Sequence, residues 1–201
     1  MRTIYLIRHG EPALPGGERI CLSSTDLPLS DYGRRQGEAL QRWFSTCAPM
    51  PVYSSDLLRT RETAAYLAEA VTPMSELREI GVGEWEGLSF PEIRRRFPEE
   101  YALRGQDPVR YGIPGGEPPA ECLERAMTAL RKLVEQTEGD FAVVAHAGIN
   151  RLILCALQGR PLKDFLKIPQ PYGCINILHA DGDALCVHAV GLEPQTMNSE
   201  D

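Results

Sequence analysis

Apolar residues in this chain follow two alternating patterns, short continuous runs and longer stretches with helical spacing. The short runs predict strands over residues 3–7, 51–54, 72–75, 141–146, 174–178 and 184–190. The longer stretches predict helices over residues 31–44, 56–70, 89–97, 117–137 and 148–158. Serine precedes the first two predicted helices, as Ser30 and Ser55, where its hydroxyl can cap the helix. Strands that alternate with helices in this way indicate an α/β protein.

The order of these elements predicts a three-layer α/β/α sandwich with a mostly parallel central sheet and an antiparallel edge strand. Residues 141–145 are all apolar, which is typical of a central strand buried on both faces. The last two strands are joined through Asp181-Gly182-Asp183 and predict a hairpin at one edge. Residues 98–120 are rich in proline, glycine and charge, and predict an irregular excursion near a site. We expect a single domain over residues 1–192 and a polar tail over residues 193–201.

Composition and charge narrow the class of protein. The chain has 201 residues, of which 43% are hydrophobic, enough to bury a core without disulfides. Its net charge of −7 argues against a nucleic-acid partner. No run approaches the roughly 20 apolar residues that span a bilayer, so we expect no membrane partner. The start of the chain has no secretory pattern and the six cysteines form no Cys-x-x-Cys pair, so we expect a cytoplasmic protein with reduced thiols.

Neither a metal ion nor another cofactor is predicted. The histidines and cysteines show none of the spacings that bind zinc. The sequence leaves the oligomeric state open, a homodimer included.

Candidate chemistry lies where two of the predicted strands end. Arg8-His9-Gly10 follows the first strand, and His146-Ala147-Gly148 follows the fourth. Because ligands collect beyond the carboxyl ends of strands in open α/β sheets, we expect the two histidine loops to converge. A histidine can act as a nucleophile, an arginine supplies positive charge in a rigid fork, and a glycine lets the backbone come close. These residue types predict a phosphate site that works through a phosphohistidine.

Four motifs extend this pattern along the chain. In order, they are Arg8-His9-Gly10-Glu11, the Ser54–Ala64 segment with Arg59, the Leu77–Gly87 segment with Glu79, and Val144-Ala145-His146-Ala147-Gly148. Over about residues 2–192 the chain resembles the histidine phosphatase superfamily, in the branch of cofactor-dependent phosphoglycerate mutases and small phosphatases such as alpha-ribazole phosphatase. The resemblance implies a phosphoglycerate mutase-like fold.

The resemblance also implies a role for each matching residue. His9 would be the nucleophile, with its second ring nitrogen held by a backbone carbonyl of the same loop. Arg8, Arg59 and His146 would surround the transferred phosphoryl group, His146 as an imidazolium, because phosphoryl transfer depends mainly on placed charge. The backbone N–H of Ala147 would add a further donor.

Glu79 would be the general acid for the leaving oxygen and then the base that activates water. Glu84 and Glu86 are two further candidates for this role, and spacing alone does not choose among the three. The family pattern selects Glu79.

The chain departs from the family pattern in the loop that follows the nucleophile. Pro15 stands where relatives often have asparagine, and Ser23 and Ser24 are the remaining candidates for that phosphate contact. The excursion over residues 86–116 is shorter than the segment that closes over the ligand in the mutases. A more open site favours water as the acceptor.

The predicted function is therefore metal-independent hydrolysis of a small phosphorylated metabolite. Two alternatives stay open: phosphoglycerate mutase-type phosphoryl transfer, and a non-catalytic protein that binds phosphorylated ligands. The sequence does not identify the natural substrate. A second acidic group on it could be recognised by arginines of the excursion, which could equally form a solvated face: Arg94, Arg95, Arg96, Arg104 and Arg110.

Overall fold

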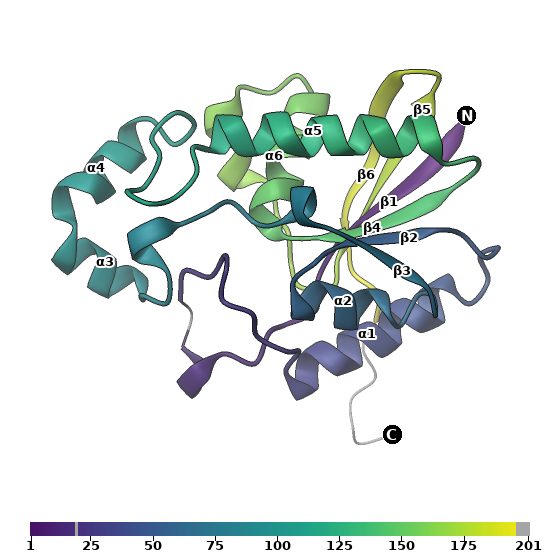
Figure 1. The fold of residues 1–201 in the computed structure, drawn as a ribbon, viewed down its shortest axis with the longest axis horizontal. Coiled ribbons are helices and arrows are strands. Elements are labelled where there is room, and N and C mark those ends of the chain that lie inside the picture. The colour runs from purple at the N-terminus through teal and green to yellow at the C-terminus, as the bar shows by residue number, and fades with distance from the viewer. Residues whose placement is uncertain (19, 196–201) are drawn as a thin grey trace.

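A six-stranded sheet forms the middle layer of the computed structural model, which describes residues 1–18 and 20–195 (Figure 1). Its strands are β1 (Arg2–Arg8), β2 (Val52–Ser55), β3 (Val71–Met74), β4 (Phe141–Ala145), β5 (Ile175–Asp181) and β6 (Ala184–Leu192). They lie in the order β3-β2-β4-β1-β5-β6. The first four pair in parallel, whereas β5 is antiparallel to both β1 and β6. The predicted fold class is confirmed, with an antiparallel pair at the edge.

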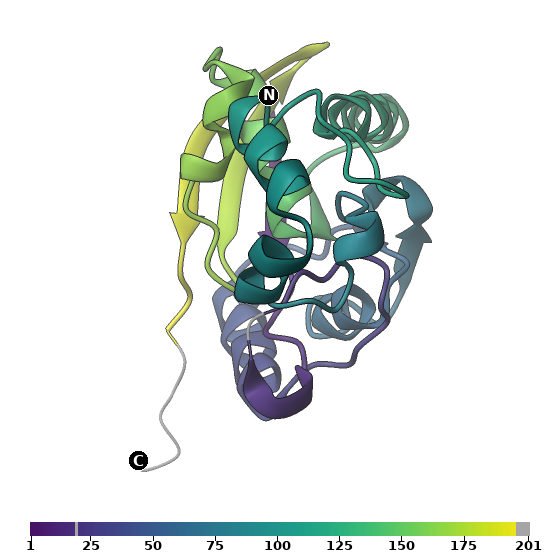
Figure 2. The same cartoon turned by 90° about the vertical axis from the view of Figure 1, so that its left-hand side faces the viewer.

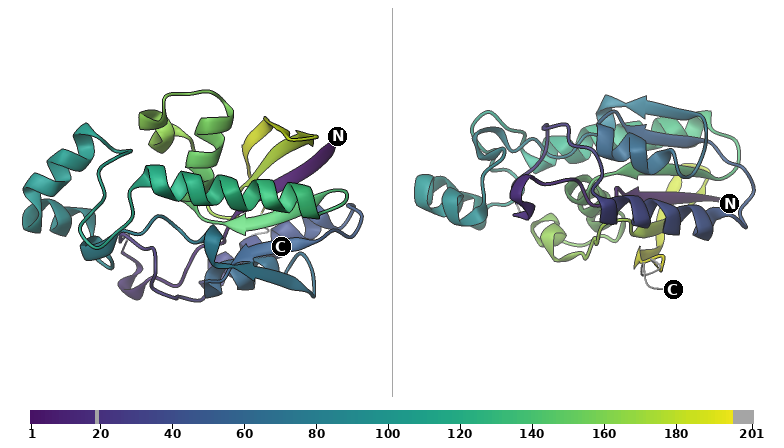
Figure 3. Two further views of the ribbon diagram at one scale, coloured as in Figure 1. Left: turned by 45° about the horizontal axis from the view of Figure 1, so that its top comes forward. Right: turned by 90° about the horizontal axis from the view of Figure 1, so that it is seen from below.

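Helices cover both faces of this sheet. Those with labels in Figure 1 are α1 (Asp31–Phe44), α2 (Leu58–Ala64), α3 (Phe90–Arg96), α4 (Pro98–Gln106), α5 (Pro119–Gln136) and α6 (Ala147–Leu157). α1 and α2 lie on one face, and α5 and α6 lie on the other (Figure 1). α3 and α4 lie beyond the end of the sheet, as the side view in Figure 2 and the two views in Figure 3 show.

The alternation of side chains along the strands explains why the sheet needs two helical layers. Ile4 and Leu6 of β1 are fully buried in the larger core with α5 and α6. Ile7 points to the opposite face and packs with Leu40 of α1. Since every residue of β4 is buried, this strand lies at the centre, as its apolar sequence predicts.

The two predicted serine caps have different outcomes. Ser30 caps α1, because its hydroxyl accepts a hydrogen bond from the N–H of Gly33 at 2.9 Å. α2 is shorter than predicted at both ends, and Ser55 is not its cap. Asp26, from a loop 32 residues earlier in the chain, accepts the N–H of Leu58 at 2.5 Å instead.

Other segments also differ from the prediction. Residues 98–120 are not irregular throughout, because they contain α4 and the start of α5. A 3-10 helix over Leu162–Lys167 was not predicted. The predicted polar tail lies outside the described residues from position 196 onward.

The described part of the chain contains no helix that is both long enough and apolar enough to cross a membrane. None of the six cysteines, all of which lie in the described part of the chain, forms a disulfide.

Candidate active site

The four parallel strands end at one edge of the sheet, and each delivers a predicted site residue there. His9 follows β1, Arg59 lies in the first turn of the helix after β2, Glu79 follows β3 and its short 3-10 turn, and His146 follows β4. Arg8, the last residue of β1, pairs with Ala145, the last residue of β4. The two histidine loops therefore begin at the same level of neighbouring strands, and the expected convergence is present.

A cavity of about 530 Å³ opens at this edge. Its lining includes most of the predicted site residues, namely Arg8, His9, Arg59, Glu79 and Ala147. His146 lies directly behind it, with its ring centroid 5.1 Å from that of His9. The sequence-predicted residues thus form one cluster at the carboxyl ends of the strands.

The His9 ring is held in one tautomer. Its Nδ1 lies 2.6 Å from the carbonyl oxygen of Gly10, so Nδ1 carries the proton and donates it to that oxygen. This is the backbone contact that the sequence analysis expected. Burial, together with the nearby charges of Arg8 and Arg59, lowers the pKa of His9 well below its usual value. At neutral pH the ring is therefore neutral, and Nε2 carries a lone pair.

His146 is completely buried, and neither of its ring nitrogens has a hydrogen-bond partner among the described residues. Burial, then His9 and the two arginines, lower the pKa of His146 well below its usual value. These effects favour a neutral imidazole in the protein without a ligand, and the imidazolium expected beside a bound phosphoryl group stays a prediction. A phosphate dianion beside the ring would oppose the effect of the arginines.

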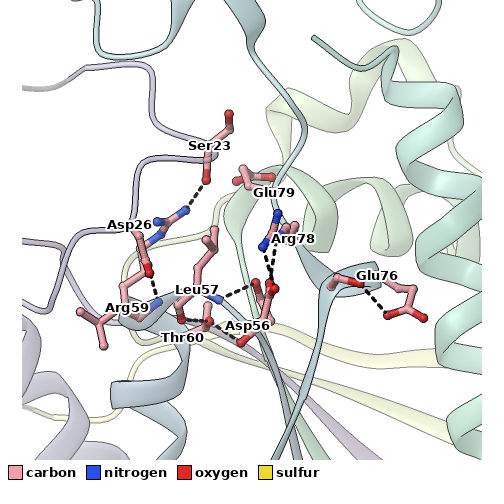
Figure 4. A network of polar contacts seen from close by, with 12 residues as sticks. Ser23, Asp26, Asp56, Leu57, Arg59, Thr60, Glu76, Arg78 and Glu79 are labelled. Atoms are coloured by element: carbon pink, nitrogen blue, oxygen red, sulfur yellow. Dashed lines mark hydrogen bonds and ion pairs between the residues drawn. The ribbon is translucent and has the colours of Figure 1, made fainter.

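The two arginines of the cluster are held from behind by backbone carbonyls. Arg8 donates to the carbonyl of Gln170, and its guanidinium carbon lies 3.6 Å from the centre of the Tyr172 ring. Arg59, only 1% exposed, donates to the carbonyl of Ser23 at 2.8 Å (Figure 4). It also donates to the carbonyl of Thr25 at 2.9 Å. Such contacts fix the direction of each guanidinium before any ligand binds.

Glu79 is held by backbone amides at the start of α6. Its carboxylate accepts hydrogen bonds from the N–H groups of Gly148 at 2.9 Å, Ile149 at 3.1 Å and Ile80 at 2.9 Å. A side chain at Gly148 would have no room, because its Cβ would lie 2.5 Å from the Glu79 carboxylate. The glycine of the second histidine loop therefore permits the close approach of Glu79.

The other two candidate glutamates have different positions. Glu84 is exposed at the surface. Glu86 accepts hydrogen bonds from the backbone N–H groups of Ser23 and Thr25 and from the Ser23 hydroxyl, at 2.5–3.1 Å. The same two loop residues present their carbonyls to Arg59. Glu86 therefore supports Arg59 through the loop.

Ser23 and Ser24 do not line the cavity that contains His9. Both line a smaller hollow of about 220 Å³ on the far side of Glu79. This hollow also contains Arg78, which is ion-paired with Asp56 at 2.7 Å (Figure 4). The expectation that either serine could take the place of the missing asparagine is therefore not met. Of the five arginines considered for a second acidic group, the cavity lining includes only Arg104.

Two residues of this cluster were not found from the sequence. The Tyr172 ring lies 5.6 Å from that of His9 and also covers Arg8, and Gln170 supplies the carbonyl that Arg8 contacts. Both lie in the loop that precedes β5, which has no motif or periodicity. These residues could have been found only from the position of their loop beside β1. That position follows from the strand order, which the sequence does not give.

Comparison with known proteins identifies the class that this fold and cluster define. The family model of the histidine phosphatase superfamily (branch 1) matches residues 4–192. The chain therefore belongs to this superfamily.

Curated relatives include the 6-phosphofructo-2-kinase/fructose-2,6-bisphosphatase of Gallus gallus, which is 33% identical over 86% of this chain and 38% of its own length. Enzyme 3 of the same name from Homo sapiens is 31% identical over 93% of this chain and 38% of its own length. The chain thus spans about two fifths of the length of these relatives.

Solved structures of similar size show the same fold. YhfR of Bacillus stearothermophilus has a TM-score of 0.87 and 28% identity, and the match covers 94% of this chain and 96% of that one. The alpha-ribazole phosphatase of Shigella flexneri has a TM-score of 0.84 and 21% identity, with 98% and 100% of the two chains covered.

The indirect support of Arg59 leads to a testable expectation. Glu86→Ala should lower kcat/KM for p-nitrophenyl phosphate by about tenfold or more, since a displacement of about 1 Å at a catalytic group can cost about 10²-fold. Glu84→Ala, which changes an exposed glutamate two residues away, is the matched control and should have little effect. In an Arg59→Ala background, Glu86→Ala should cost little further activity, because the group that it positions is gone. Equal losses from Glu86→Ala in both backgrounds would contradict this role.

Proposed function

We propose that the protein hydrolyses small phosphate monoesters without a metal ion, through a phosphohistidine intermediate on His9. One observation carries the proposal: His9 is held as the neutral tautomer, with its free Nε2 in a cavity that Arg8 and Arg59 also line. Nucleophile and positive charge are thus prearranged in one place. The substrate would be a small phosphorylated metabolite, taken up in the cytoplasm without a nucleic-acid or membrane partner.

In the first step, the Nε2 lone pair of His9 attacks the phosphorus atom and the ester P–O bond breaks. Arg8 and Arg59 bind the oxygens of the transferred group, over which the negative charge is spread in the transition state. His146, neutral and without a partner on either nitrogen among the described residues, is available to donate a further hydrogen bond. Glu79 gives a proton to the leaving oxygen, so that a neutral alcohol departs.

In the second step, water attacks phosphorus and the P–N bond breaks. Glu79 takes the proton of this water, which restores the protonated acid, and His9 returns to its neutral form. The backbone amides of Gly148 and Ile149 keep the Glu79 carboxylate in place through both steps. Each residue ends the cycle as it began, and the products are an alcohol and inorganic phosphate.

The position of residues 86–116 supports water as the acceptor. This segment forms α3 and α4, which lie beyond the end of the sheet (Figure 3), and it contributes Phe90 and Tyr101 to the cavity lining. Phe90 and Leu166, which line the cavity from different elements, are 41% and 56% exposed, so this part of the lining is in contact with solvent. Water can therefore reach a phosphohistidine on His9.

The decisive experiment combines turnover with detection of the intermediate. The purified protein should release p-nitrophenol from p-nitrophenyl phosphate at the same rate before and after treatment with EDTA. Among the described residues no group of three or more histidine, cysteine, aspartate or glutamate side chains could hold a metal ion. Rapid quenching with a ³²P-labelled substrate should trap phosphate on the protein in an acid-labile, alkali-stable bond, as expected for phosphohistidine. Binding of phosphate esters without turnover would instead indicate a non-catalytic protein, and transfer of label to an added alcohol faster than to water would indicate a mutase.

A further inference from the structure

The cavity is much larger than a phosphoryl group needs. Its volume of about 530 Å³ is in the range of sites that bind a whole small molecule. Arg8, His9 and Arg59 line only one end of it. The rest of the lining therefore contacts the leaving group of the substrate, the part that is attached to the phosphate.

This outer part of the cavity is walled by large apolar and aromatic side chains. Trp85, Tyr101 and Ile113 come from the segment after Glu79, and Phe165 comes from the 3-10 helix over Leu162–Lys167. Trp85 and Tyr101 are stacked, with their ring centroids 6.0 Å apart and their planes 27° apart. Two separate parts of the chain thus contribute to one apolar wall.

Two further apolar side chains of the lining are exposed to solvent. Phe90, the first residue of α3, is 41% exposed, and Leu166 is 56% exposed. Large apolar side chains that stay exposed at the edge of a cavity are typical of a ligand-binding surface, because a ligand removes their apolar area from water. Their placement on two elements favours a ligand that contacts both.

The polar groups in the same part of the lining are mostly held by the protein. Arg104 donates to the carbonyl of Pro108, and Arg151 donates through Nε to the carbonyl of Ile168 at 2.8 Å. Glu117 is ion-paired with Arg125 at 2.7 Å. The cation most accessible to a second acidic group is Lys163, which is exposed. A backbone contact leaves the charge of an arginine in place, so the preference for an apolar leaving group rests on the exposed apolar area of Phe90 and Leu166.

We propose that the preferred substrates are phosphate monoesters of bulky aromatic or apolar alcohols, whose leaving group packs between the Trp85 wall and the Phe90 and Leu166 side chains. The inference rests on the proposed phosphatase function and adds the class of substrate to it.

The test compares 2-naphthyl phosphate with phenyl phosphate. Both esters release a phenol-type alcohol of similar acidity, so the comparison isolates the size of the apolar group. The value of kcat/KM should be roughly tenfold or more higher for the naphthyl ester, the scale on which apolar pockets discriminate. It should also exceed the value for 3-phosphoglycerate, which carries a second acidic group. Phe90→Ser and Leu166→Ser should each reduce the naphthyl-to-phenyl ratio of kcat/KM several-fold.

Leu103→Ser provides the matched control. Leu103 is 47% exposed on α4 and is not part of the cavity lining, so this variant should keep the wild-type ratio. Turnover of all three esters with a naphthyl-to-phenyl ratio near one would overturn the apolar leaving-group site and leave the phosphatase function standing. A preference for 3-phosphoglycerate, or an equal fall of the ratio in Leu103→Ser, would overturn it as well. If wild type turned over none of the esters, the proposed function would fail and this inference with it.

Discussion

His9→Ala should reduce kcat for p-nitrophenyl phosphate by roughly 10⁴-fold or more and abolish the trapped phosphoprotein, because removing a nucleophile removes the whole covalent route. His146 cannot take over. It has no carbonyl contact like the one between His9 and Gly10, so no tautomer is selected for attack. The measurement is steady-state release of p-nitrophenol together with ³²P incorporation after rapid quenching.

His188→Ala is the control for this experiment. His188 is exposed on β6, where it stacks on His179 at the far edge of the sheet from β3, and the variant should keep normal turnover. Near-wild-type activity or normal labelling of His9→Ala would show that another residue is the nucleophile.

Glu79→Gln should lower kcat/KM for an alkyl phosphate such as glycerol 2-phosphate by about 10²–10⁴-fold, the contribution typical of a general acid. The loss for p-nitrophenyl phosphate should be much smaller, since p-nitrophenolate departs without a proton. The ratio of the two losses is the informative quantity. Gly148 and Ile149 donate to different oxygens of Glu79, so the substitution also places an NH₂ group against one of these two N–H donors, and that disturbance affects both substrates alike.

The second step gives an independent measurement on the same variant. Because Glu79 also activates water, Glu79→Gln should accumulate phosphoprotein from p-nitrophenyl phosphate and show a burst of p-nitrophenol. Glu84→Gln changes an exposed glutamate nearby and should show neither effect. Equal losses for both substrates without a burst would reduce Glu79 to a residue that only lines the cavity.

The central strands and their loops could be predicted from the sequence for a simple physical reason. β1 and β4 are apolar runs buried in the sheet, so their ends are marked where His9 and His146 interrupt the pattern. Parallel strands end at the same edge, and the meeting of the two loops follows from that. Spacing alone does not show which of Glu79, Glu84 and Glu86 is the general acid. Only the family pattern selects Glu79.

The support of Arg59 could not be predicted, because it comes from a loop without periodicity. Neither the Glu86 contacts to Ser23 and Thr25 nor the cap that Asp26 provides to α2 has a sequence signature, since each joins residues 32 to 63 positions apart. These contacts depend on the final position of the loop.

The helix α4 was missed although its start had a helical signal. Pro98 suits the first turn of a helix, and Glu99 and Glu100 lie where acidic residues favour a helix N-terminus. Proline and charge were instead interpreted as features of a loop. Pro98 therefore marks a beginning here, after the end of α3 at Arg96.

Because α3 and α4 lie outside the layers of the sheet, the residues proposed for the reaction and those proposed to contact the leaving group belong to different parts of the fold. The groups proposed to transfer phosphate follow four paired strands, so a change in one strand alters the geometry at its neighbours. The wall around the leaving group comes largely from residues 82–113 and has its own small core, formed by Trp85, Ile93 and Ile113. Substitutions there can reshape the wall while the strands stay as they are. Substitutions that accumulate in this one surface segment can therefore change which substrates the protein accepts. The reaction itself is retained, because the groups proposed to carry it out lie at the ends of the strands.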